Sequence, residues 1–147
     1  MSKRCLRIGD RAVFTKKITE KMVLAFAELT GDYSKIHVDK KFAENTRFGR
    51  PIAHGLIAGS FISTVMGTEL PGSGTIFLDQ QIEFLLPVYY DDTITANVEL
   101  RRIEEKHSVY IAELYGECVN QREEIVCRAT AHQMLPKDFP HRRLPCF

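Results

Sequence analysis

A chain of 147 residues has room for one domain with a substantial buried core. Its 44% hydrophobic and 27% charged residues are ordinary for a globular protein, and a formal charge of +1 argues against general affinity for nucleic acid or anionic membranes. The four cysteines form no Cys-x-x-Cys pair, and residues 1–7 lack the apolar stretch of a secretory signal. These features predict a reducing, cytoplasmic location without a disulfide framework.

The first half of the chain is predicted to be helical after one short strand at residues 13–15. Thr19 is a suitable N-cap for a helix that ends at Gly31. The apolar residues at helical spacing in this segment are Met22, Val23, Phe26, Ala27 and Leu29. Residues 32–38 show neither a helical nor a strand period, so they are predicted to form a loop. Asp39 then caps a short helix that runs through Asn45, and residues 47–51 form a second loop.

Residues 54–70 predict a helix that is apolar on nearly all sides, with glycine, serine and threonine between the large side chains. Such a helix is expected to be buried, and the small residues let it lie close against a sheet. It is too short and too rich in small residues to indicate a membrane span.

The second half predicts four consecutive strands, at residues 75–86, 93–103, 109–118 and 124–134. The links between them are short and polar, so antiparallel pairing of consecutive strands is the simplest topology. An antiparallel β-sheet wrapped around one buried central α-helix is an α+β architecture, the single hot-dog fold. We therefore expect a hot-dog domain over residues 1–135 and a loose C-terminal tail over residues 136–147.

Asp32 and His37 are the candidate catalytic pair, because both lie in a loop that rigid helices hold. A carboxylate and an imidazole on one turn can share a water, with one group accepting a proton while the other donates one. The ordinary alternative is that Asp32 is a turn residue after a glycine and that His37 is a surface histidine. Spacing alone favours this alternative.

His54 and Gly55 stand where the buried helix begins, so the Gly55 N–H could contact a ligand oxygen at the positive end of the helix dipole. The alternative is that Gly55 only permits close packing. Ser63, on the same helix, either faces a pocket or bonds back to a carbonyl one turn earlier. We expect no metal site, since no zinc-type spacing joins the four possible ligands, which are Asp32, His37, Asp39 and His54. The chain also has no dinucleotide-binding or Walker loop, and no cofactor is expected.

Four segments of the sequence together resemble one known family. Residues 29–37 read Leu-Thr-Gly-Asp-Tyr-Ser-Lys-Ile-His, and residues 50–56 read Arg-Pro-Ile-Ala-His-Gly-Leu. Residues 70–74 read Leu-Pro-Gly-Ser-Gly, and residues 81–88 read Gln-Ile-Glu-Phe-Leu-Leu-Pro-Val. In this order they resemble the MaoC-like (R)-specific enoyl-CoA hydratases and the related 3-hydroxyacyl-thioester dehydratases. The resemblance extends over about residues 8–135.

The resemblance implies that Asp32 and His37 position one water for addition to a trans-2-enoyl thioester, which gives an (R)-3-hydroxyacyl thioester, or for the reverse dehydration. It places His54, Gly55 and Ser63 at the substrate-binding site, with the Gly55 N–H as the donor to the thioester oxygen and Ser63 as a polar contact in the pocket. The implied substrate is an acyl-CoA or an acyl-carrier-protein thioester. The implied assembly is a homodimer whose two sheets join edge to edge.

Ser34 and Lys35 depart from the family pattern, which usually has Asn-Pro between the catalytic residues. The loop loses the rigidity of proline, and Lys35 could instead meet a phosphate of the substrate. Two other functions stay open: a hot-dog acyl thioesterase and a non-catalytic acyl-thioester-binding module. The thioesterase is disfavoured because the helix over residues 54–68 has no acidic or amide side chain.

Overall fold

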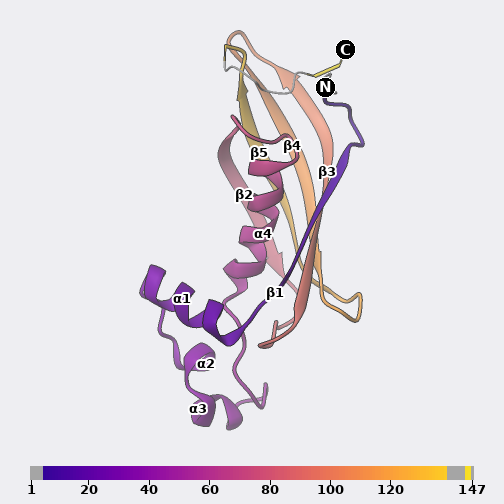
Figure 1. Cartoon of the computed structure of the whole chain (residues 1–147). Helices are drawn as coiled ribbons and strands as arrows, with labels where there is room; N and C mark the ends of the chain where they lie inside the picture. The colour runs from indigo at the N-terminus through magenta and orange to yellow at the C-terminus, as the bar shows by residue number, and fades with distance from the viewer. Residues whose placement is uncertain (1–4, 139–144, 147) are drawn as a thin grey trace.

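The computed structural model describes residues 5–138 and 145–146. The elements in chain order are β1 (Arg11–Lys17), α1 (Glu20–Thr30), α2 (Lys35–Val38), α3 (Lys40–Glu44), α4 (Gly55–Thr68), β2 (Ile76–Phe84), β3 (Thr93–Glu105), β4 (Val109–Val119) and β5 (Ile125–Pro136). The sheet curves around α4, and α1, α2 and α3 lie together beyond one end of it (Figure 1). Within the described residues no helix is long and apolar enough to cross a membrane.

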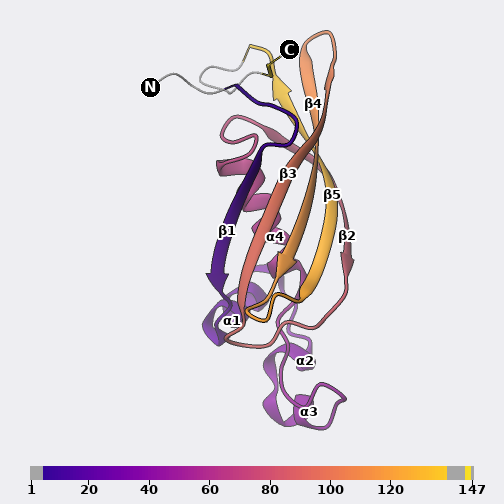
Figure 2. The same ribbon diagram turned by 90° about the vertical axis from the view of Figure 1, so that its right-hand side faces the viewer.

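The five strands form one antiparallel sheet in the order β1-β3-β4-β5-β2. The two edges of the sheet are therefore β1 and β2, which lie on opposite sides of the ribbon in Figure 2. Helix α4 contacts all five strands. This arrangement confirms the prediction of a hot-dog fold.

Helix α4 buries one face along its length against the sheet, whereas Gly55, Leu56, Ser60, Gly67 and Thr68 are exposed, so the prediction of a buried helix is confirmed for that face. Seven of its residues are buried: Ile57, Ala58, Gly59, Phe61, Ile62, Val65 and Met66. A Cβ at Gly116 of β4 would lie only 2.8 Å from Cγ2 of Ile62, and a Cβ at Gly59 would lie 2.8 Å from Cδ1 of Ile82. Helix and sheet thus meet at positions that accept only hydrogen as a side chain.

The substitution Gly116→Ala is expected to destabilise the protein by about 1–3 kcal/mol, because Ile62 is buried and has little room to move away from the new methyl group. Urea unfolding followed by circular dichroism measures this change. Gly67→Ala is the control, since a Cβ at Gly67 meets no atom within 4 Å and alanine raises helix propensity by about 1 kcal/mol. Equal stability of the two variants would contradict the close contact between α4 and β4.

The prediction that consecutive strands pair is confirmed for β3 with β4 and for β4 with β5, but it is wrong for β2 with β3. The crossover segment, which we define as residues 85–92, carries the chain from one edge of the sheet toward the other. Its start is bonded to β5, where the Leu85 N–H donates to the Val126 carbonyl at 2.9 Å. Its end is bonded beyond β1, where the Asp91 N–H donates to the Ile18 carbonyl at 2.7 Å. These bonds hold β2 beside β5 and leave β1 as the partner of β3.

Two local predictions in the first half also need correction. Val23 and Ala27 are the buried residues of α1, whereas Leu29 is 82% exposed, so the face of α1 toward the core is narrower than predicted. The predicted loop at residues 32–38 ends in a single helical turn, α2. The capping predictions are confirmed: Thr19 Oγ1 accepts from the Met22 N–H, and Asp39 Oδ1 accepts from the Phe42 N–H.

The described ends of the chain meet, which the sequence did not predict. Leu6 forms a parallel bridge with Pro145, and Cys5 and Cys146 form a disulfide. The expectation that the cysteines stay unpaired is wrong for these two residues. Cys118 and Cys127 are free and buried. The predicted loose tail falls largely on residues 139–144 and 147, outside the described part of the chain, so its boundary stays a prediction.

Candidate functional site

Asp32 leaves helix α1 at a left-handed turn. Gly31 has φ of 80°, a conformation that glycine adopts without strain, and its N–H donates to the Ala27 carbonyl at 2.8 Å. The Asp32 carboxylate accepts from the Ser34 N–H at 3.1 Å, and its side chain is 51% exposed. The second oxygen of the carboxylate is thus available to a ligand or a water.

His37 lies on α2, and its ring orientation is set by one backbone oxygen. Nδ1 lies 2.7 Å from the Ile52 carbonyl oxygen, which can only accept, so Nδ1 carries the proton and Nε2 carries the lone pair of the neutral ring. Burial lowers the pKa of His37, and the neighbouring His54 lowers it further. The bond to Ile52 and the Asp32 charge oppose this shift without cancelling it. Neutral His37 therefore presents Nε2 as a proton acceptor.

His54 is buried directly behind this pair, with 3% of its side chain exposed. Its Nε2 donates to the Asp32 backbone carbonyl at 2.9 Å and lies 3.9 Å from the Asp32 carboxylate. The His54 ring packs against the His37 ring at 4.0 Å between centroids and against the Phe26 ring at 4.7 Å, with the ring planes tilted by 31° and 50°. Its Nδ1 is buried without a hydrogen-bond partner among the described residues. His54 thus links the backbone of Asp32 to the ring of His37.

The three side chains converge beside a cavity of about 430 Å³. One carboxylate oxygen of Asp32 and one ring nitrogen each of His37 and His54 all lie within 4.8 Å of one another. A water with two hydrogen bonds of about 2.8 Å joins atoms roughly 4.5 Å apart, so this separation suits a shared water. Apolar residues form most of the remaining wall: Phe26, Phe48, Ile52, Ala53, Leu56, Ala58, Phe84, Leu85, Leu86, Pro87, Val88, Val126 and Cys127.

These three side chains are a poor fit to a zinc ion. The ligand atoms of a tetrahedral zinc site lie about 3.4 Å apart, because each bond to the metal is about 2.0–2.2 Å long. The separations here extend to 4.8 Å. Two of the ring nitrogens also already bond to the carbonyls of Ile52 and Asp32. The geometry suits proton transfer through a water better than metal coordination.

Gly55 lines the cavity as the first residue of α4, and its N–H belongs to the first turn, whose N–H groups have no partner within the helix. A Cβ at Gly55 would lie 2.8 Å from the Phe84 ring, so a side chain here would displace an aromatic wall of the cavity. Ser63 is half-buried on α4 and is not among the residues that line the cavity. Ser60 bonds back to the Ile57 carbonyl at 2.6 Å.

Ser34 and Lys35 both lie beside the catalytic candidates. Ser34 serves Asp32 through its backbone N–H, which any residue other than proline would supply. Lys35 is exposed, with Nζ 5.9 Å from the centroid of the Phe42 ring. Although Ser-Lys stands where the family usually has Asn-Pro, the Asp32 carboxylate still accepts a hydrogen bond from the backbone of its own loop.

Sequence reasoning missed most of the cavity wall. Helical spacing predicts Phe26 as a core residue of α1, and the sequence predicts only a loop position for Arg47. Both residues line the cavity. Residues 84–88 belong to a segment that the family resemblance included, but their apolar run reads equally well as a buried strand. No local signal separates a cavity wall from a core.

The chain is similar to known proteins over most of its length. Residues 7–117 match the family model described as a MaoC like domain. The chain is 41% identical over 105 residues to an (R)-specific enoyl-CoA hydratase of Aeromonas caviae, covering 71% of this chain and 78% of that protein. It is 30% identical over 135 residues to a mitochondrial 3-hydroxyacyl-acyl-carrier-protein dehydratase of Solanum lycopersicum, covering 92% and 81%.

A solved structure, titled an (R)-hydratase from A. caviae involved in PHA biosynthesis, superposes with a TM-score of 0.84 at 37% identity. The superposition covers 89% of this chain and 98% of that one. Similarity of sequence and of structure thus extends through the sheet, α4 and the segment that carries Asp32 and His37. The chain belongs to the MaoC-like domain family.

Proposed function

We propose that this protein is a hydro-lyase that adds water to trans-2-enoyl thioesters to give (R)-3-hydroxyacyl thioesters, and that catalyses the reverse dehydration. The observation that carries the proposal is the convergence of Asp32 and His37 within 4.8 Å beside an apolar cavity. The names of the Aeromonas and Solanum relatives support the same chemistry, on a CoA thioester and on an acyl-carrier-protein thioester respectively.

In the proposed mechanism, one water donates its two hydrogens to the Asp32 carboxylate and to Nε2 of neutral His37. Its oxygen then bonds to C3 of the substrate while the π electrons move toward C2 and the thioester oxygen. The Gly55 N–H donates to that oxygen as its negative charge grows. The proton taken from the water returns to C2 on the same face, because both groups that can carry it lie on one side of the substrate.

A product assay tests the proposed activity. Incubation with a trans-2-enoyl-CoA is expected to remove the absorbance of the conjugated thioester and to form an equal amount of the (R)-3-hydroxyacyl product, without release of free thiol. Parallel reactions with the same acyl group on CoA and on acyl-carrier protein identify the preferred carrier. Failure to hydrate either substrate would reject the proposed function in favour of a binding module.

The thioesterase alternative has less support from the site. The residues of α4 that line the cavity are Gly55, Leu56 and Ala58, and none of them can act as a base or a nucleophile through its side chain. Release of CoA from an enoyl substrate without any hydroxyacyl product would favour that alternative over hydration.

We also propose a homodimer that forms through β2. This edge strand exposes large apolar side chains, Ile76 (48%), Phe77 (46%) and Leu78 (47%) at its start and Phe84 (50%) at its end, where it lines the cavity. A long apolar edge of this kind invites pairing with another strand. Two copies joined at β2 would bury these residues, and the second copy would cover the edge of the sheet where Phe84 lines the cavity.

Leu78→Lys is expected to weaken self-association at least about tenfold, because a buried lysine would appear twice in a symmetric interface. Light scattering after gel filtration measures the mass, which should fall from twice 16.8 kDa toward 16.8 kDa. Val13→Lys is the matched control on the opposite edge strand β1, where Val13 is 60% exposed. Loss of the dimer in the Val13 variant instead would assign the interface to β1.

A cytoplasmic location is likewise a proposal. Cys118 and Cys127 support it, since they stand directly opposite each other on β4 and β5 and remain free thiols. The disulfide between Cys5 and Cys146 points the other way, because such bonds are rare in reducing compartments. Cell fractionation with a thiol count under non-reducing conditions decides between the two observations.

A further inference from the structure

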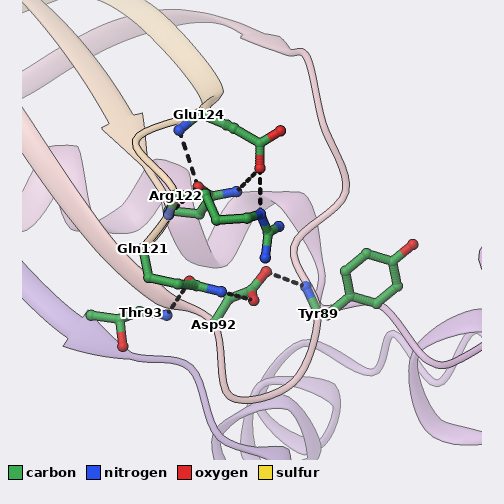
Figure 3. Close-up of polar contacts among 7 residues, drawn as sticks. Tyr89, Asp92, Thr93, Gln121, Arg122 and Glu124 are labelled. Carbon is green, nitrogen blue, oxygen red and sulfur yellow. Dashed lines mark hydrogen bonds and ion pairs between the residues drawn. The ribbon is translucent and has the colours of Figure 1, made fainter.

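The crossover segment, residues 85–92, is anchored by a buried carboxylate at its end. Asp92 is 4% exposed, and its two oxygens accept from the Tyr89 N–H at 2.9 Å and from the Gln121 side-chain amide at 2.8 Å. The Gln121 carbonyl oxygen in turn accepts from the Thr93 N–H at 3.0 Å. Figure 3 shows this network running from the crossover segment to the turn between β4 and β5. Breaking it would leave a charge buried without partners, so the network holds the segment in one place.

The backbone that follows Tyr90 is held as well. The Asp91 N–H donates to the Ile18 carbonyl at 2.7 Å, and the Ile18 N–H donates to the Asp92 carbonyl at 2.9 Å. Asp91 has φ of 69°, a left-handed conformation that a residue other than glycine keeps only when its surroundings impose it. Tyr90 therefore projects from a rigid base.

The Tyr90 hydroxyl donates a hydrogen bond to the backbone carbonyl of His37. The second anchor of His37, the Ile52 carbonyl that accepts from Nδ1, belongs to a residue that forms an antiparallel bridge with Tyr89. Two of the bonds that hold His37 thus depend on the crossover segment, one through the Tyr90 hydroxyl and the other through the backbone of Tyr89 but not through its hydroxyl. The tyrosine whose hydroxyl holds the His37 backbone lies 53 positions later in the sequence.

We propose that Tyr90 is a positioning residue for the reaction, which holds the His37 backbone so that Nε2 faces the shared water. The proposal rests on the proposed function. Tyr90 is not among the residues that line the cavity, so it acts on the reaction through His37 and not through the substrate. Its loss should therefore reduce turnover while substrate binding stays almost the same.

Tyr90→Phe keeps the ring and removes only the hydroxyl. We expect kcat to fall about 10- to 100-fold, because a catalytic group displaced by an ångström loses that much, while KM changes less than about twofold. The matched control is Tyr89→Phe, which removes a hydroxyl of the same segment that bonds to the Phe48 carbonyl at 3.3 Å. The control should retain kcat within about a factor of two of wild type.

The titration of His37 gives a readout that does not depend on activity. Burial lowers the pKa of His37, and the groups that face its ring are His54, Asp32 and the Ile52 carbonyl. Once the His37 backbone has lost its bond to the Tyr90 hydroxyl, α2 can move and water can reach the ring, so we expect the pKa of His37 to rise toward its ordinary value in Tyr90→Phe but not in Tyr89→Phe. Imidazole NMR resonances of the substrate-free protein measure this shift, and thermal unfolding verifies that both variants are folded.

The possible results separate this proposal from the proposed function. If the wild type hydrates enoyl thioesters and Tyr90→Phe retains both kcat and the His37 titration, Tyr90 has no positioning role. Equal losses in both tyrosine variants would also overturn the proposal, since the effect would then belong to the whole segment. If the wild type has no hydratase activity but the His37 titration moves only in Tyr90→Phe, the orienting role of Tyr90 stands and the proposed reaction fails.

Discussion

Asp32→Asn and His37→Ala are each expected to lower kcat/KM for hydration by about 10²–10⁴-fold, since each removes one of the two groups that share the water. Asparagine has the shape of aspartate but cannot take a proton, so the first change tests charge with little change in packing. The double variant should be hardly slower than the slower single variant, because the two residues act as one unit. Steady-state hydration of an enoyl-CoA measures kcat/KM for the two single variants and the double variant.

A second carboxylate–imidazole pair in the same protein is the control. His132 Nδ1 lies 2.7 Å from the Asp79 carboxylate, and neither residue lines the cavity. Asp79→Asn and His132→Ala should leave hydration within about twofold of wild type, because chemistry depends on position beside the substrate and not on the pairing alone. Wild-type activity in both Asp32→Asn and His37→Ala would refute the catalytic assignment.

His54→Ala is expected to reduce both stability and activity. Deleting a buried aromatic ring costs about 3 kcal/mol or more, by analogy with phenylalanine truncations in protein cores. The change also removes the donor to the Asp32 carbonyl and the ring that packs against His37. We therefore expect kcat to fall at least about tenfold in the fraction that remains folded. Urea unfolding and single-turnover hydration separate the two effects.

His54→Gln is the matched variant, since its side-chain amide can still donate toward the Asp32 carbonyl. It should recover part of the lost activity while remaining less stable than wild type, because the contacts with His37 and Phe26 are absent. If His54→Ala were as stable and as active as wild type, the buried ring would have no part in holding the site.

Local features of the fold could be predicted because neighbouring residues encode them. Thr19 and Asp39 cap helices through their own side chains, and Gly31 adopts the left-handed turn that ends α1. The buried helix followed from a composition that leaves no polar face. Two of the four later strands, β3 and β4, begin at the predicted residue, and β2 and β5 begin one residue later, because turn residues mark these points.

The candidate site could be predicted only in part. Asp32 and His37 lie five positions apart, so one loop can present both, and the resemblance to a known family singled them out. The sequence offered His54 as a substrate contact, whereas the structure directs its Nε2 to the Asp32 backbone. Ser63 was expected in the pocket and lies outside the set of residues that line the cavity.

Local patterns of residue type predict every helix and strand of this protein except α2, because caps, turns and hydrophobic periods act over a few residues. Three contacts follow only from the folded arrangement: β2 pairs with β5, the His54 ring packs against the His37 ring, and the Tyr90 hydroxyl bonds to the carbonyl of His37. Each of these contacts joins residues at least 17 positions apart and depends on where the folded sheet places them. These contacts depend on where segments distant in sequence lie in the folded chain, and no local pattern of residue types encodes that placement.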